Sequence, residues 1–124
     1  MKELIQNFKA LSDETRLRVL ILLLERECCV CEVMQALIIS QSRASRALNS
    51  LYNTGILKLR KEGRWSLYSI DREGMDEHLD YMVKAVVKAL EGNRLTEIDL
   101  ERLRKAERTS PACVESNRRM KAEQ

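Results

Sequence analysis

A chain of 124 residues with 44% hydrophobic and 33% charged residues can bury one modest core, so one domain is expected and a larger binding surface must come from oligomerisation. No apolar run reaches membrane-spanning length, and the amino terminus lacks the apolar stretch of a signal peptide, which predicts a cytoplasmic protein with no membrane partner. The single His and the lack of a Ser/His/Asp set or a Gly-rich phosphate loop predict neither an enzyme nor a catalytic cofactor.

Basic residues are concentrated in the middle of the chain. Between Gln41 and Arg64 there are six basic residues and one acid, a local net charge of +5, whereas the whole chain carries +3. The remainder therefore carries −2. A basic block on a slightly acidic remainder favours a polyanionic partner, and double-stranded DNA is the expected one.

The first half of the chain predicts three helices in tandem, an arrangement typical of a helix-turn-helix core. Ser12 and Asp13 mark the start of the second, which is expected to run to about Arg26. Leu4, Phe8 and Leu11 suit a short first helix, and core-facing stripes are expected at Leu17, Leu20, Ile21 and Leu24 in the second helix and at Val30, Val33, Met34 and Leu37 in the third.

The fourth helix, which Ser40 caps, has two opposite faces. Its apolar stripe comprises Ala44, Ala47, Leu48 and Leu51, and a polar stripe lies about 200° around the helix. Side chains on the polar side suit base edges and phosphates, so this is the predicted recognition helix. Its expected DNA-binding residues are Ser40, Gln41, Ser42, Arg43, Ser45, Arg46 and Asn49.

A basic hairpin is expected directly after the recognition helix. Ile56 to Arg60 alternates apolar and basic residues, Trp65 to Ile70 is rich in strand formers, and the tip lies between them. This hairpin is a predicted wing, and Arg60, Lys61 and Arg64 are its expected DNA contacts.

A long helix is expected from about Glu73 to Glu91, and a further helix from Leu95 to about Glu107. The apolar face of the long helix, together with the first helix, is the predicted homodimer interface. The expected fold is mostly α with a small β-hairpin: a winged helix-turn-helix that dimerises through its terminal helices. Residues 1–92 form the expected DNA-binding and dimerisation domain, and 93–124 a C-terminal helix and polar tail.

Cys28-Cys29-Val30-Cys31 places three sulfurs just ahead of the recognition helix. Without a secretory signal, such cysteines favour metal ligands or buried thiols over a disulfide framework. Residues two apart in a regular helix point about 200° away from each other, so Cys29 and Cys31 would need an unwound turn to bind one ion. Ile38 and Ile39 are the expected short link from that distortion to the recognition helix.

Several of these segments, taken in order over roughly Lys9 to Ile70, resemble the ArsR/SmtB family of metal-sensing winged-helix repressors. The resemblance is carried by Leu11 to Leu17, Cys29 to Glu32, Ser40-Gln41-Ser42 with Ser45, Arg46 and Leu48, Gly55-Ile56-Leu57, and Arg60 to Trp65. It implies a homodimeric repressor that holds a palindromic operator and releases it on binding arsenite or antimonite. The paired cysteines Cys29 and Cys31 are similar to the ligands of the arsenic-responsive branch.

The match to the arsenic branch is incomplete. Where that branch commonly has a third cysteine, this chain has Met34, so a third thiolate must come from Cys28, slightly favoured for its proximity, from Cys113 or from a small thiol. Cadmium or lead, methylated trivalent arsenicals and thiol oxidation stay open as alternative signals. Asp76-Glu77-His78 resembles half of the family's zinc site, but the second half is missing and an exposed helix start is favoured.

Overall fold

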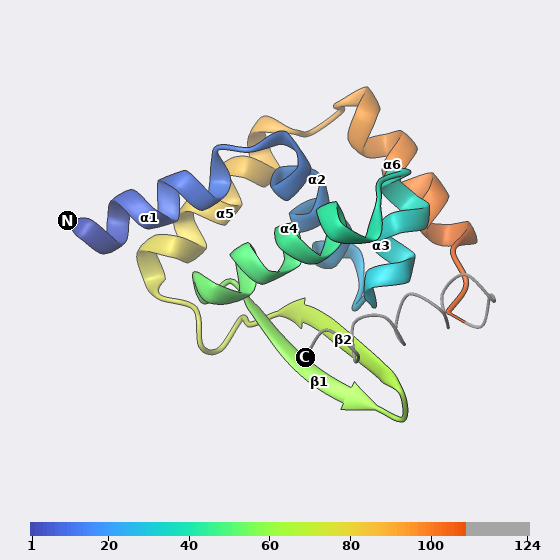
Figure 1. The fold of residues 1–124 in the computed structure, drawn as a ribbon. Helices are drawn as coiled ribbons and strands as arrows, with labels where there is room; N and C mark the ends of the chain where they lie inside the picture. The colour runs from blue at the N-terminus through green and yellow to red at the C-terminus, as the bar shows by residue number, and fades with distance from the viewer. Residues whose placement is uncertain (109–124) are drawn as a thin grey trace.

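The computed structural model describes residues 1–108, and Cys113 lies outside this range. Within it the helices are α1 (Lys2–Leu11), α2 (Glu14–Glu25), α3 (Val30–Leu37), α4 (Gln41–Asn53), α5 (Glu77–Ala89) and α6 (Arg94–Lys105). The strands β1 (Leu57–Glu62) and β2 (Trp65–Ile70) form one antiparallel hairpin that projects from the helical body (Figure 1). None of the helices in residues 1–108 is long and apolar enough to cross a membrane.

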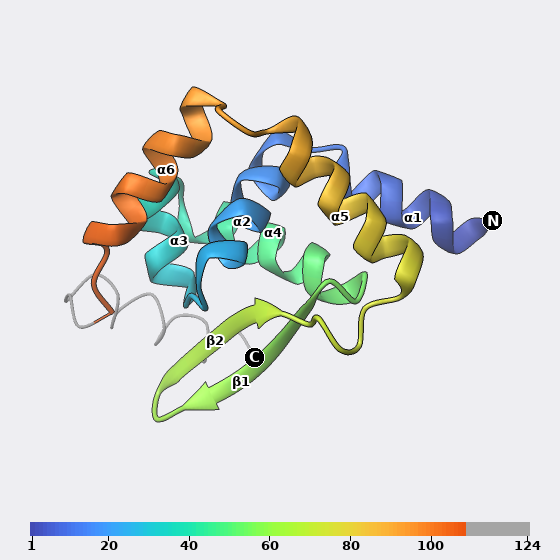
Figure 2. The same cartoon turned by 180° about the vertical axis from the view of Figure 1, so that it is seen from behind.

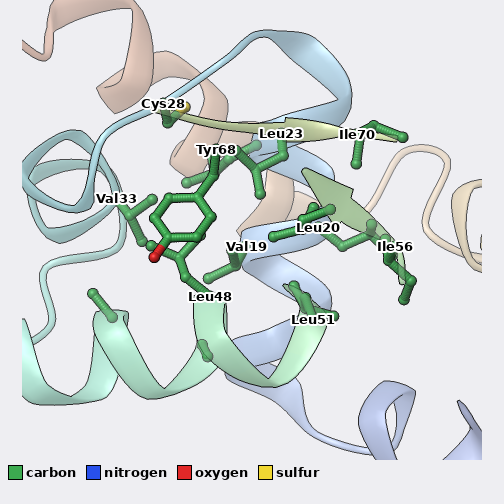
Figure 3. Close-up of a cluster of buried hydrophobic side chains, with 14 of the residues drawn as sticks. Val19, Leu20, Leu23, Cys28, Val33, Leu48, Leu51, Ile56, Tyr68 and Ile70 are labelled. Carbon is green, nitrogen blue, oxygen red and sulfur yellow. The ribbon is translucent and has the colours of Figure 1, made fainter. Parts of the chain in front are cut away.

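The core lies where α2, α3 and α4 meet the base of the hairpin. Figure 3 shows Tyr68 of β2 among side chains of these helices, next to Val33 and Leu48. All three are buried, and Tyr68 keeps only 3% of its surface exposed. Burial of this apolar surface is the main stabilising term, and it joins the hairpin to the helix-turn-helix. The winged helix-turn-helix predicted from the sequence is therefore confirmed.

The burial of α2 differs from the predicted stripe. Only Leu20 of that stripe is fully buried, and the other fully buried positions are Val19, Leu22 and Leu23. The reason is that α2 is surrounded by α1, α3, α4, α6 and β2, so nearly its whole circumference is covered. A helix in that position does not need the single apolar face of a surface helix.

The turn between α3 and α4 contains an unusual backbone conformation. Ile38 ends α3 with φ 55° and ψ 57°, and it is the only non-glycine residue in positions 1–108 with a positive φ. This left-handed conformation is unfavourable for a β-branched residue. It turns the chain sharply into Ser40, whose hydroxyl accepts a hydrogen bond from the Arg43 backbone N–H at 3.2 Å and caps α4.

The long helix begins later than expected, at Glu77 rather than near Glu73. The Asp71 carboxylate accepts a hydrogen bond from the Gly74 N–H at 3.0 Å, which closes a turn before the helix starts. α1 and α5 lie side by side (Figures 1 and 2), and Asn7 Nδ2 of α1 is 3.0 Å from His78 Nε2 of α5.

The last described helix packs on the helix-turn-helix. Figure 2 shows α6 beside α3, and Leu103 of α6 is part of the main core. The Asp99 carboxylate, 1% exposed, accepts two hydrogen bonds of 2.8 Å from the Arg18 guanidinium of α2. A buried, bidentate pair of this kind is geometrically specific, so it fixes how α6 sits on α2.

Candidate nucleic-acid interface and sulfur site

The two faces of α4 divide as predicted. Ala44, Ala47, Leu48 and Leu51 are buried against the body, whereas Ser42, Arg43, Arg46 and Asn49 are exposed. A helix that packs on one side and offers arginine, serine and asparagine on the other has the chemistry needed for the major groove. Ser45 is different, since its Oγ is buried and has no hydrogen-bond partner within residues 1–108.

The start of α2 lies against the first turn of α4, which the sequence did not indicate. Arg43 donates a 2.9 Å hydrogen bond to the Thr15 hydroxyl. A cavity of about 220 Å³ here is lined by Arg16, Arg43 and Arg46, with Asp13 as its one acid. Positive charge therefore extends from α4 to α2, as a DNA backbone beside the groove would require.

On the hairpin, Lys58, Lys61 and Arg64 are exposed, but Arg60 is already paired. Its guanidinium donates to both carboxylate oxygens of Glu27 at 2.9 and 2.7 Å and forms an ion pair with Glu62 at 2.9 Å. Hydrogen bonds to Glu27 and Glu62 raise the pKa of Arg60 above its ordinary value. Arg60 must therefore exchange a carboxylate for a phosphate if it contacts DNA.

The cysteines lie directly on the wing. Cys28 pairs with Tyr68 of β2 through two backbone hydrogen bonds of 3.0 and 2.8 Å, so a single β-bridge joins the cysteine segment to the hairpin. Cys29 and Cys31 then form a small cluster with Leu67 of β2, against which Trp65 packs. We call these four residues the sulfur cluster.

Cys28 is separated from the other two. Its side chain belongs to the main core (Figure 3), and its Sγ donates to the Arg26 carbonyl at 3.4 Å. Cys31 Sγ accepts a 3.0 Å hydrogen bond from the Gln35 side chain. Cys31 is disulfide-bonded in this structure, so an ion site at this position requires its reduction.

Burial is the main influence on the two remaining thiols. It raises the pKa of Cys28 to about 12, and the nearby Glu32 carboxylate adds to the rise. Burial also raises the pKa of Cys29 to about 11, although the Glu32 N–H donates to its sulfur and counteracts the rise. Both are therefore protonated near neutral pH, and a thiophilic ion must displace their protons when it binds.

The start of α3 changes the geometric argument from the sequence. Cys29 is the N-cap, with φ −89° and ψ 169°, and only Cys31 is inside the helix. The 200° separation expected within a regular helix does not apply to a residue with extended backbone, and both side chains reach the same cluster. The argument for unwinding a helical turn therefore does not apply to Cys29, which already lies outside the helix.

The remaining cluster of potential ligands in residues 1–108 is at the α1–α5 junction. Glu3, Asp76 and His78 offer ligand atoms within 4.8 Å of one another, and all three are exposed. Glu3 supplies a partner for the half site noted in the sequence, but exposed acidic groups occur commonly without an ion.

We compared the sequence and the fold with those of known proteins. Residues 13–58 match the family described as "Bacterial regulatory protein, arsR family". The chain is 46% identical over 78 residues to a cadmium resistance transcriptional regulatory protein, CadC homolog, of Staphylococcus aureus, covering 62% of this chain and 61% of that protein. It is 43% identical over 83 residues to the arsenic resistance transcriptional regulator ArsR1 of Pseudomonas putida, covering 66% and 64%.

An HTH-type transcriptional regulator of Methanocaldococcus jannaschii is 41% identical over 80 residues, covering 64% of this chain and 85% of that protein. Among solved structures, the homodimeric winged helix-turn-helix DNA-binding domain Mb0332 of Mycobacterium bovis superposes with a TM-score of 0.61 and 25% identity, covering 75% of this chain and 82% of that one. The chain belongs to the arsR family of bacterial regulatory proteins. It spans less than two thirds of the length of the S. aureus and P. putida relatives.

Proposed function

We propose that this protein is a transcriptional repressor that binds operator DNA as a homodimer and releases it when trivalent arsenic or antimony binds Cys29 and Cys31. The observation that carries the proposal is the contact between sensor and reader. Cys29 and Cys31 pack on Leu67 of the wing, and Cys28 is hydrogen-bonded to its neighbour Tyr68. The names of the arsenic and cadmium relatives support a soft-ion signal.

Two routes lead from the sulfur cluster to the DNA-binding surface. One runs through α3 and the turn at Ile38 to α4, as inferred from the sequence. The other is more direct, because the cysteine segment is hydrogen-bonded to β2 and Glu27 holds Arg60 of β1. An ion that pulls the two sulfurs together repositions β2, and a ligand that favours this arrangement weakens the DNA-bound one by linkage.

For the third sulfur ligand we propose Cys113 rather than Cys28. Cys28 is packed in the main core, on the other side of the segment from the sulfur cluster. Arg108, by contrast, is held beside the cluster by a 2.7 Å ion pair with Glu32. Cys113 is five residues further, and five extended residues span at most about 17 Å, so its sulfur is within reach.

X-ray absorption of arsenite complexes tests this assignment. We expect three sulfur neighbours in Cys28→Ser and two in Cys113→Ser, measured on reduced protein without added small thiols. Three sulfurs in Cys113→Ser would exclude Cys113 as the required ligand.

The inducer is identified by titration. A fluorescent duplex selected from a random-sequence pool is saturated with reduced protein and challenged separately with arsenite, antimonite, methylarsenite, cadmium, lead and zinc. We expect release by arsenite and antimonite at the lowest concentrations. Release by cadmium or lead alone would mean that the protein senses divalent ions rather than trivalent arsenic or antimony.

A thiol-redox switch is the second candidate, and the disulfide at Cys31 favours it. Oxidation would exchange the same sulfur between a thiol and a disulfide without any ion. Release of the duplex by oxidant in the presence of a chelator, and recovery of binding with a reductant, would support this alternative.

A further inference from the structure

Glu32 is a buried carboxylate at the centre of the sulfur site. It is 2% exposed and accepts hydrogen bonds from three donors: the Cys29 N–H at 2.9 Å, the Arg108 guanidinium at 2.7 Å and the Arg26 guanidinium at 2.5 Å. Burial opposes its charge, but the hydrogen bonds from Arg108, Cys29 and Arg26 keep the pKa of Glu32 below its ordinary value. A buried charge with this number of donors has a fixed position.

The hydrogen bond from the Cys29 N–H fixes the backbone of one proposed ligand. Glu32 is the third residue of α3 and Cys29 its N-cap, so the pair forms the reciprocal arrangement of a capping box. Because this arrangement keeps Cys29 extended, its side chain lies in the same cluster as Cys31. The Glu32 carboxylate thus determines the position of the Cys29 sulfur relative to the Cys31 sulfur.

The two arginines connect the carboxylate to the end of α6. Arg26 also donates to the Leu103 carbonyl of α6 at 3.1 Å. Arg108, just beyond α6, also donates to the Glu27 carbonyl at 3.2 Å. Next to them, Glu107 and Gln35 of α3 exchange two hydrogen bonds of 3.1 Å. These bonds hold the end of α6 against the cysteine segment.

We propose that Glu32 is a positioning residue for the Cys29–Cys31 ion site, and that Arg26 and Arg108 hold its carboxylate in place. Ion binding and docking of the α6 end therefore stabilise each other, because each favours the same position of Cys29, and such coupling is reciprocal. This inference rests on the proposed function, since it names what orders the ligands of that site. Groups that orient metal ligands typically contribute about 10–100-fold to affinity.

The test measures affinity for methylarsenite, which needs only two protein sulfurs, in the reduced full-length chain carrying Cys113→Ser. This background removes any role of the tail sulfur. Glu32→Gln keeps the shape of the side chain but loses the charge that holds the two guanidiniums, and we expect affinity to fall about 10–100-fold. Arg108→Gln should weaken binding in the same direction, and Arg104→Gln, which alters an exposed arginine of α6 paired with Glu101, should not.

A double-mutant cycle separates positioning from a general loss of stability. If Arg108 acts through Glu32, the combined variant should lose less affinity than the two single losses together. Methylarsenite should also slow trypsin cleavage after Arg108 in the background chain and have a smaller effect in Glu32→Gln. If Glu32→Gln fails to fold, Arg108→Gln and the protection from trypsin decide the question.

The outcomes distinguish this inference from the proposed function. Failure of the background chain, and of the natural chain, to bind methylarsenite or arsenite would overturn the proposed function. Normal binding by both, together with unchanged affinity in folded Glu32→Gln or in Arg108→Gln, would overturn only the positioning role.

Discussion

At the scale of single residues, Arg46 is the most direct test of the DNA interface. It is exposed on α4 and lines both the cavity toward α2 and a larger one toward α1. We expect Arg46→Ala to weaken duplex binding about tenfold or more, measured by fluorescence anisotropy at fixed salt. Lys88→Ala removes the same charge from α5 and is the control. Equal losses in the two variants would remove α4 from the interface.

The buried Cys28 thiol predicts that the free energy of unfolding falls at alkaline pH. Because folding raises the pKa of Cys28 from 9.0 to about 12, its contribution to stability is complete below pH 9 and is lost as the pH rises toward 12. Between pH 8.5 and 10.5 this loss amounts to about 2 kcal/mol. When reduced protein is unfolded with urea across that pH interval, the free energy of unfolding should decline less in Cys28→Ala than in the natural chain. Parallel curves would show that burial does not perturb this thiol.

At the scale of elements, Glu27 connects the cysteine segment to the wing. It is half-buried, precedes Cys28 and accepts a hydrogen bond from Arg60 at each of its two carboxylate oxygens. Glu27→Gln should leave Glu62 as the one acidic partner of Arg60 within residues 1–108, which makes Arg60 easier for a phosphate to bind, and it removes a negative charge near DNA, so duplex binding should tighten severalfold at low salt. Glu101→Gln, which removes an acid from the exposed side of α6, should leave affinity unchanged. Weaker binding by Glu27→Gln would mean that this ion pair orders the wing for DNA.

The helices and strands show which structural features could be predicted from the sequence. The apolar and polar faces of α4 followed from local periodicity, because one side of that helix is covered and the other is exposed. The two strands lie where the sequence predicted them, but their burial does not alternate: β1 is exposed beyond Leu57, and Ser66 to Tyr68 of β2 are all buried. The single stripe expected on α2 was incomplete: Leu20 is buried and Leu17 and Leu24 pack on the core, but the helix is also buried on other sides, since five neighbouring elements surround it. Cys29 ends outside α3 because of a capping box with Glu32, and residues three apart gave no sign of that role.

The contacts that join the cysteine segment to the end of α6 and to the hairpin could not be predicted from the sequence, because their residues lie far apart along the chain. Arg108 meets Glu32 across 76 positions of sequence, and Cys28 meets Tyr68 across 40. No periodic pattern records such a pairing, which depends on how α6 and the hairpin pack on α3. The sequence therefore identified the cysteines, whereas the structure was needed to find Glu32, Arg26, Gln35 and the contact with the wing.

At the scale of the whole molecule, the apolar face of α5 that the sequence predicted for the dimer packs largely within the protomer, since Leu79 and Val83 are buried in the main core. The apolar surface that stays exposed on α1 and α5 favours the dimer proposed here. Phe8 is 57% exposed and Tyr81 is 62% exposed, on helices that lie side by side. Phe8→Glu should produce monomers in sedimentation experiments and weaken duplex binding, because a palindromic site requires two copies. Ile98→Glu, which places the same charge on exposed apolar surface of α6, should remain dimeric. A dimeric Phe8→Glu would place the interface elsewhere.

The central claim is that the sulfur cluster on the wing controls the release of DNA. Its most direct test is the anisotropy of a labelled duplex bound to reduced protein and titrated with arsenite, compared among the natural chain, Cys29→Ser and Cys31→Ser. A serine hydroxyl is neutral and hard where a thiolate is charged and soft, so both variants should bind the duplex normally and fail to release it. If either variant releases the duplex at the arsenite concentration that acts on the natural chain, the sensor lies elsewhere and the account is contradicted.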